Sequence, residues 1–167
     1  MADEKKVVYD LDGYDVITNG LLELLDQFPG MPEGEQMGFS ALGEERGKAI
    51  FPTEGPVIEQ EKTSVTGKVT QYCSYPFHVV YRESGLSESR KIKVKEWLDT
   101  LGRWLEKQVV KVNGQDEQLT EYPPLTGTRQ FTTIRRMSGG YLDSTNENKS
   151  ENWAIYINAR YTNISKR

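Results

Sequence analysis

The sequence predicts an α+β domain in which an antiparallel or mixed sheet of about four to five strands carries two helices on one face, with long loops. Three observations support this fold class. The expected elements run helix, hairpin, helix and two strands, without strand-helix-strand repeats. One expected helix has a long apolar stripe with two tryptophans, and the last expected strand alternates apolar and polar residues. A chain of 167 residues fits one domain, spanning 1–167.

The first helix is expected from Asp15 to about Phe28, where Pro29-Gly30 ends it. Its apolar residues recur at helical spacing. They are Ile17, Leu21, Leu24, Leu25 and Phe28. Residues 1–14 form an N-terminal arm. Residues 29–56 are rich in Gly, Pro and Glu, so they predict an extended loop with at most two short strands, around residues 37–39 and 49–51.

An antiparallel hairpin follows. Its arms are Val57 to Ser64 and Lys68 to Arg82, both rich in Val, Thr and Tyr, and Gly67 allows a tight connection. Pro76 in the second arm has no backbone N–H, so it predicts a bulge or an edge position there.

The second helix begins after Ser87 or Ser89, either of which can cap it, and runs to about Gln108. One apolar stripe at spacings of three and four marks the face that packs on the sheet. This core stripe consists of Val94, Trp97, Leu98, Leu101, Trp104 and Leu105.

Two strands complete the sheet. Residues 113–127, with Asn113-Gly114 and Pro123-Pro124, are expected to be a second extended loop. Strands are expected from Arg129 to Met137 and from Asn152 to Ile164. In the last one, Trp153, Ile155, Ile157, Ala159 and Tyr161 alternate with Tyr156, Asn158, Arg160 and Thr162. Such alternation predicts one buried side and one side that faces water or a partner.

Charge is unevenly distributed along the chain. Residues 1–61 carry 14 acidic and 4 basic residues, a net of −10, whereas residues 62–167 carry 11 and 17, a net of +6. This asymmetry can serve a basic surface for nucleic acid, or a ring in which the acidic face of one subunit meets the basic face of the next. Alternatively, the fold simply intermixes the two ends.

Several chemistries are excluded by composition. A single cysteine, Cys73, cannot form an internal disulfide, and together with the single His78 it excludes an ordinary zinc cluster. We expect both residues to be structural. The start of the chain lacks the apolar stretch of a signal peptide, and no apolar run approaches the roughly 18 residues of a membrane span. We therefore expect a cytosolic protein with no membrane contact and no cofactor or metal.

One segment, Lys6 to Gly13, is similar to the first motif of haloacid-dehalogenase-type phosphotransferases, an apolar strand that ends in Asp-x-Asp-Gly. That resemblance implies Asp10 as nucleophile and Asp12 as acid/base, with Mg²⁺ between them. The family motif continues with Thr where this chain has Tyr14, and the family's parallel sheet is not expected here. The alternative interpretation is a surface turn that leads into the first helix.

A nucleic-acid platform is a further alternative, because basic and aromatic residues interleave on two expected strands. They are Arg129, Phe131, Arg135, Arg136, Tyr141, Tyr156 and Arg160. The net charge of −4 weakens this interpretation, and aromatic residues on a strand face are more often part of a core or an interface.

The segment from Gly139 to Tyr161 resembles the C-terminal hairpin of small phage tail proteins, often labelled minor capsid proteins, in prophages of Gram-positive bacteria. The order of elements across residues 15–164 resembles the lambda U-like tail terminator (tail completion) family. The resemblance implies a virion protein of the tail or neck, assembled in the host cytoplasm, that caps the tail tube as a homo-hexameric ring and joins tail to head.

The family resemblance also implies the partners and the kind of site. The partners are further copies of the chain, the tail tube protein and the head-tail connector, and DNA passes through without sequence-specific binding. No catalytic residue is expected, so the protein is not expected to be an enzyme. The interface is expected at Arg129, Arg135, Arg136, Tyr141, Asp143, Tyr156 and Arg160. A head-tail connector or a tail tube subunit is the alternative.

Overall fold

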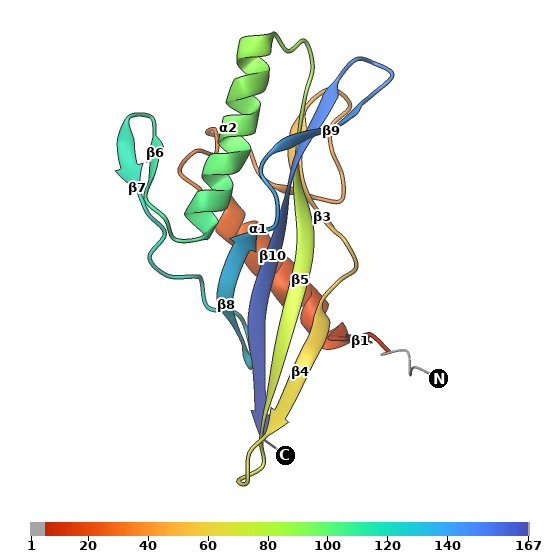
Figure 1. Cartoon of the computed structure of the whole chain (residues 1–167), viewed down its shortest axis with the longest axis vertical. Helices are drawn as coiled ribbons and strands as arrows, with labels where there is room; N and C mark the ends of the chain where they lie inside the picture. Colours follow the sequence, from red (N-terminus) through yellow and green to blue (C-terminus); the bar gives the residue numbers. More distant parts are fainter. Residues whose placement is uncertain (1–5, 167) are drawn as a thin grey trace.

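Two long strands, β5 and β10, form the axis of the molecule (Figure 1). The computed structural model describes residues 6–166, so the first five residues of the expected N-terminal arm lie outside the described part. The helices are α1 (Tyr14–Asp26) and α2 (Glu88–Leu105), and the 3-10 turn η1 (Leu11–Gly13) precedes α1. The strands are β1 (Val8–Tyr9), β2 (Gly38–Phe39), β3 (Gly47–Pro52), β4 (Val57–Thr63), β5 (Lys68–Glu83), β6 (Val110–Val112), β7 (Gln115–Glu117), β8 (Arg129–Arg136), β9 (Tyr141–Thr145) and β10 (Glu151–Lys166).

The main sheet has eight strands within residues 6–166. Its central order is β1-β4-β5-β10-β8, with β3 also on β5, β2 on β3 and β9 on β10. The mixed α+β class agrees with the sequence prediction, but four to five strands is an undercount. The additional strands are short: β3 and β9 pair with β5 and β10, each 16 residues long, whereas β1 pairs with β4 and β2 with β3.

Pro76 does not form the expected bulge, but on one side of β5 it does lie at a local edge. Pro76 pairs opposite Asn158 in the interior of the sheet, without a register shift at that point. On the other side of β5, β3 ends opposite Phe77 and β4 begins opposite Ser74. The missing N–H of Pro76 therefore falls in the gap between two partner strands, while its carbonyl accepts a hydrogen bond from the Thr53 N–H at 3.0 Å.

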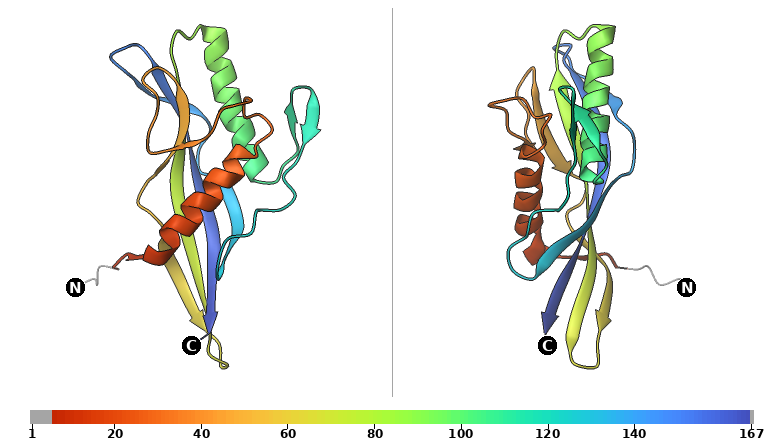
Figure 2. Two further views of the ribbon diagram at one scale, coloured as in Figure 1. Left: turned by 180° about the vertical axis from the view of Figure 1, so that it is seen from behind. Right: turned by 90° about the vertical axis from the view of Figure 1, so that its left-hand side faces the viewer.

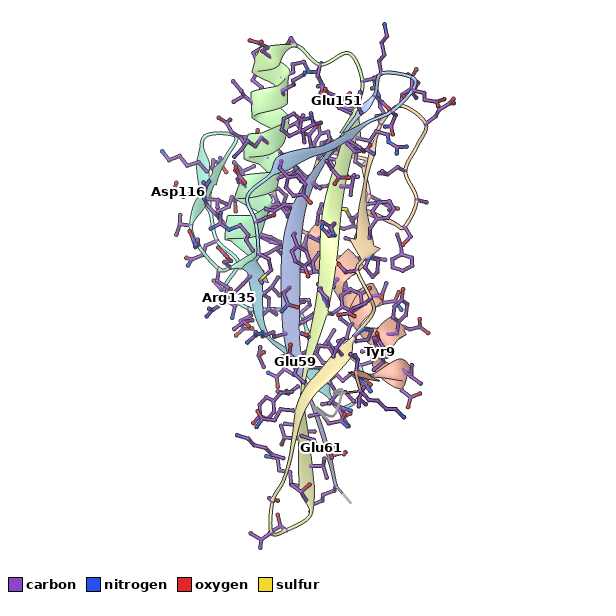
Figure 3. All side chains as sticks on the ribbon, turned by 45° about the vertical axis from the view of Figure 1, so that its right-hand side comes forward. Tyr9, Glu59, Glu61, Asp116, Arg135 and Glu151 are labelled. Atoms are coloured by element: carbon purple, nitrogen blue, oxygen red, sulfur yellow. The ribbon has the colours of Figure 1, made fainter. Side chains whose placement is uncertain are left out.

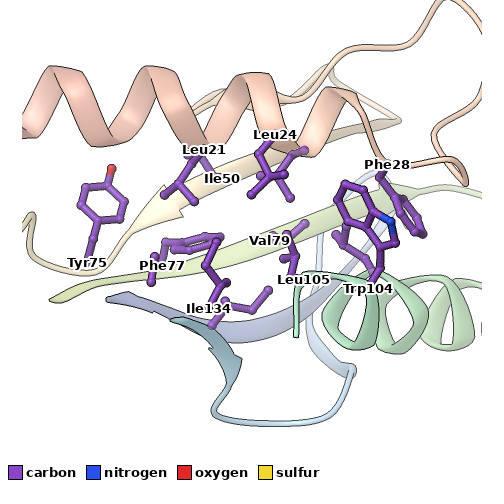
Figure 4. Close-up of a cluster of buried hydrophobic side chains, with 14 of the residues drawn as sticks. Leu21, Leu24, Phe28, Ile50, Tyr75, Phe77, Val79, Trp104, Leu105 and Ile134 are labelled. Atoms are coloured by element: carbon purple, nitrogen blue, oxygen red, sulfur yellow. The ribbon is translucent and has the colours of Figure 1, made fainter. Parts of the chain in front are cut away.

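Both helices pack on the same face of the sheet. Figure 2 shows α1 lying obliquely across β5 and β10, and Figure 4 shows residues of α1 and α2 meeting the inward side chains of the strands. Phe28 lies between the helices, with its ring centroid 5.5 Å from that of Trp97 and 5.3 Å from that of Trp104. Of the expected core stripe, Trp97 is partly exposed and the other five residues are buried.

The long loop after α1 is anchored on this core through a buried lysine. Lys48 on β3 lies over the rings of Tyr81 and Trp97, 4.3 Å and 5.3 Å from their centroids, and forms an ion pair with Glu35. The indole N–H of Trp97 donates to the Gly30 carbonyl at 2.8 Å. Cation-π contacts of this kind let the ammonium group be buried with its charge compensated.

Residues 113–127 are not entirely a loop, contrary to the sequence prediction. Asn113 and Gly114 both have positive φ, +51° and +79°, and they join β6 to β7 as a small hairpin. Two left-handed residues in a two-residue connection are typical of the type I′ turn that Asn-Gly favours.

Candidate interaction surface

The face of the sheet opposite the helices is open. On β10, Tyr156, Asn158 and Arg160 point away from the helices, because Ile155, Ile157, Ala159 and Tyr161 are buried beneath them. Strand β8 adds Arg135, which pairs opposite Asn158, and Thr133, which pairs opposite Arg160. We call this surface the open face.

Two arginines on the open face have no charged partner. Arg135 and Arg160 are exposed, and neither side chain forms an ion pair or a hydrogen bond with any residue in the range 6–166. They line a hollow of about 360 Å³ together with Thr133, Arg136, Met137 and Asn158. This arginine hollow contains no carboxylate, and the buried Oδ1 atom of Asn158 accepts no hydrogen bond.

Aromatic rings lie beside the arginine hollow. The imidazole of His78 stacks on the ring of Tyr156, with 4.7 Å between centroids and 17° between planes. Burial lowers the pKa of His78, whereas the nearby carboxylate of Asp143 raises it. Burial, and then Asp143, raise the pKa of Tyr141. Tyr141, Asp143 and Tyr156, three of the residues expected at the interface, are thus close to one another here.

Arg129 lies apart from these residues, in a buried ion pair. Its Nε and Nη2 atoms donate to the Asp10 carboxylate at 2.8 Å and 2.7 Å, and the Tyr161 hydroxyl donates to the same carboxylate at 2.7 Å. The Gly13 N–H donates to Oδ1 of Asp10 at 3.2 Å, the oxygen that also accepts from Nη2 of Arg129. Burial alone would raise the pKa of Asp10, but the hydrogen bonds from Arg129 and Tyr161 outweigh it and lower that pKa. Asp12 is exposed.

Arg136 is also engaged within the chain. It donates to Glu106 at the end of α2 through Nε at 3.0 Å, and its backbone N–H donates to the other oxygen of Glu106 at 3.0 Å. A Cβ at position 102 would collide with this side chain, so Gly102 of α2 permits the close approach. Arg129 and Arg136 therefore hold the fold together, whereas the other five expected interface residues reach the open face.

The outer edge of β8 is partly closed by side chains. The hydroxyl of Tyr122 accepts from the Ile134 N–H at 3.1 Å and donates to the Leu105 carbonyl at 2.7 Å. The next backbone N–H that points outward from β8 is that of Arg136, and it donates to the Glu106 carboxylate. Because both N–H groups already have acceptors, this part of the edge cannot pair with another strand.

Other kinds of site find little support in residues 6–166. No group of three or more His, Cys, Asp or Glu side chains in this range is placed to hold a metal ion. Burial raises the pKa of the Cys73 thiol to about 11, so at neutral pH it is a poor nucleophile. Neither helix in this range is both long and apolar enough to cross a bilayer.

Sequence reasoning missed His78 as part of this surface, and it placed Asn158 on the partner-facing side of the last strand without counting it among the interface residues. His78 was expected to be structural, although its alternation with Phe77 and Val79 was visible. The register between β5 and β10, which places His78 opposite Tyr156, is a long-range property and could not be read from the chain.

No family model matches this sequence, and no curated protein matches it.

Proposed function

We propose that this chain is a virion structural protein, a phage tail terminator that closes as a homo-hexameric ring on the end of the tail tube and provides the surface to which the head is joined. The observation that carries the proposal is the open face, where two unpaired arginines lie beside half-buried aromatic rings. Arginine and tyrosine are enriched in protein-protein interfaces. Every subunit of a ring needs such a face, because each copy must bind its neighbours through a protein-protein interface.

The mechanism in this proposal is steric. A ring seated on the end of the tube occupies the site where the next tube subunit would bind, so growth stops without any covalent step. Closure of the ring needs two different lateral surfaces that fit each other. Residues 1–61 carry a net charge of −10 and residues 62–167 a net charge of +6, and unlike charge on the two lateral surfaces would favour this fit.

A projecting arm suits the contact with the tube or the connector. The hairpin of β4 and β5, together with the end of β10, extends beyond both helices (Figure 1). Its tip carries the fully exposed Val65, and Tyr72 and Ile164 are exposed along it. An arm of this kind reaches a second surface without disturbing the core, so we assign it to the neighbouring tail component.

Electron microscopy of the purified protein mixed with tail tubes tests the proposal. Rings at tube ends, and tubes that stop lengthening in their presence, are the expected result. The variant Tyr72→Ala/Ile164→Ala tests the arm: it should still form rings, but these rings should decorate fewer tube ends than those of the unmodified chain. Rings that never sit on tube ends would contradict the proposal.

The alternatives predict different images and assays. A tail tube subunit stacks into filaments, and a head-tail connector binds heads that lack tails. A Mg²⁺-dependent phosphotransferase hydrolyses a generic phosphate ester. Asp12→Asn is the sharper variant for that assay because Asp12 is exposed, whereas Asp10→Asn also breaks the buried pair with Arg129. Turnover that needs Mg²⁺ and is lost in Asp12→Asn would replace the structural function by an enzymatic one.

A further inference from the structure

The two margins of the sheet carry hollows of opposite charge. At the β8 margin is the arginine hollow, which is lined by the unpaired Arg135 and Arg160, by Arg136, whose charge is paired with Glu106, and by no carboxylate. At the β1 margin, a hollow of about 640 Å³ has a mostly uncharged lining that includes the carboxylates of Asp15 and Glu54 and no basic residue; its third carboxylate, Asp10, is paired with Arg129. Figure 3 shows Arg135 and Tyr9 on opposite sides of the molecule.

The β1 margin also presents a protruding knob. Leu11 in η1 is 82% exposed, and it is followed by the exposed carboxylates of Asp12 and Asp15. No basic side chain in residues 6–166 forms an ion pair with either carboxylate. Leu11 and these two carboxylates therefore present an apolar group and two unpaired negative charges to solvent at one place on the β1 margin. We call Leu11, Asp12 and Asp15 the acidic knob.

The arginine hollow has the complementary features. Arg135 and Arg160 lie on adjacent strands, two residues out of direct register, so their Cα atoms are about 7 to 8 Å apart. Like charges at that separation repel, and a carboxylate between them would relieve the repulsion. Met137 at the rim is 59% exposed, which offers an apolar surface beside the arginines.

We infer that the acidic knob of one copy docks into the arginine hollow of the next copy. This inference rests on the proposed ring and identifies the contact between its neighbouring subunits. Asp12 and Asp15 pair with Arg135 and Arg160, and Leu11 packs against Met137. The contact is heterologous, because each copy uses its β1 margin on one side and its β8 margin on the other, and such contacts generate closed rings or open helices.

Charge reversal on each side tests the contact, with sedimentation velocity as the readout and no tail components present. The hollow variant is Arg135→Glu/Arg160→Glu, and the knob variant is Asp12→Lys/Asp15→Lys. Each variant alone should self-associate on the order of 100-fold more weakly than the unmodified chain, because like charges then face each other across the contact.

An equimolar mixture of the two variants provides the decisive measurement. Glutamates in the hollow of one variant meet lysines on the knob of the other, and the remaining contact keeps its original charges, so alternating copies should regain even-membered rings. Misfolding of either variant cannot produce this recovery. A mixture that stays dissociated overturns the inference.

Matched controls alter net charge equally at other exposed sites. Lys68→Glu/Lys149→Glu changes the two far ends of the sheet, and Glu33→Lys/Glu44→Lys changes the loop after α1. Both controls should assemble like the unmodified chain. Equal loss of assembly in the controls, or undisturbed assembly in the hollow or knob variant, overturns the inference.

The remaining outcomes distinguish this subunit contact from a nucleic-acid site and from a solitary chain. If the hollow variant assembles normally but loses binding to a single-stranded oligonucleotide, the arginine hollow is a nucleic-acid site and the inference is overturned. An unmodified chain that stays monomeric up to its solubility limit overturns it as well. Rings that need the contact between knob and hollow but do not bind tube ends contradict only the terminator function. Rings that cap tubes and still form in the hollow and knob variants contradict only the docking of the knob into the hollow.

Discussion

The buried pair between Asp10 and Arg129 should be the most sensitive polar contact of the fold. The two side chains are only 6% and 12% exposed, and the carboxylate accepts four hydrogen bonds, two of them from the guanidinium. Asp10→Asn keeps the shape of the side chain but removes its charge, which leaves the guanidinium buried without a counter-ion. Breaking a buried pair in this way costs about 3 to 5 kcal/mol.

Urea unfolding followed by tryptophan fluorescence measures this loss. In a chain of this size about 1 kcal/mol corresponds to roughly 2 to 4 °C in Tm, so a thermal melt should shift down by on the order of 6 to 20 °C. The control is Asp12→Asn, an identical exchange at an exposed position two residues away, which should stay within about 0.5 kcal/mol of the unmodified chain.

A double-mutant cycle isolates the pair itself. Arg129→Met removes the guanidinium and leaves the Asp10 carboxylate buried without its main partner, so it should be destabilising alone. The double variant Asp10→Asn/Arg129→Met should lose less free energy of unfolding than the sum of the two single losses, because each half of the pair is costly mainly when the other is present. Additive losses, or an Asp10→Asn variant as stable as Asp12→Asn, would show that the two side chains are not energetically coupled.

Acidification should lower stability in two steps. Burial lowers the pKa of His78, so the unfolded chain takes up its proton first and stability begins to fall below about pH 6.5; a urea midpoint that stays constant down to pH 4.5 would contradict this step. In Asp10 and Asp99 the pKa is lowered by hydrogen bonds that outweigh the opposing effect of burial, so their contribution is complete above about pH 3.9 and is lost as the pH falls through the folded-state pKa. Trp104→Ala should cost about 3 to 5 kcal/mol in urea unfolding, and a nearly unchanged midpoint would show that the indole is not in the core. Tyr122→Phe leaves a backbone N–H of β8 without its acceptor and should cost about 1 to 3 kcal/mol, with faster hydrogen exchange at that amide; exchange as slow as before would mean that another group protects it.

The elements that the sequence predicted well are those whose local pattern and tertiary role agree. The helix of residues 88–105 has both a capping serine and a stripe of buried residues, and β10 alternates along most of its length. The strands that the sequence did not predict are of another kind. β1 has two residues and β9 has five, which is too short for a period to be visible, and both exist because a longer strand offers free backbone groups beside them.

The interaction surface was predictable only in part, for a similar reason. Alternation in β10 places Tyr156 and Arg160 on one side, and this could be read from the sequence. The sequence does not reveal that Arg129 and Arg135 have different roles, because both belong to the same strand and neither has a local partner in the sequence. Asp10, which engages Arg129, lies 119 residues away, and no local pattern indicates which of the arginines it pairs with.

The same buried pair bears on the geometry of the proposed ring. The number of copies in a closed ring follows from the angle between the two contact surfaces of one subunit, so those surfaces must be held rigidly with respect to each other. Asp10 directly precedes the acidic knob, and Arg129 begins the strand that carries Arg135 of the arginine hollow. Their ion pair, to which the Tyr161 hydroxyl from β10 also donates, therefore ties the two contact surfaces together across the sheet. In this arrangement Asp10→Asn loosens the angle as well as the fold, and we expect rings of mixed size to form at temperatures where the variant is still folded.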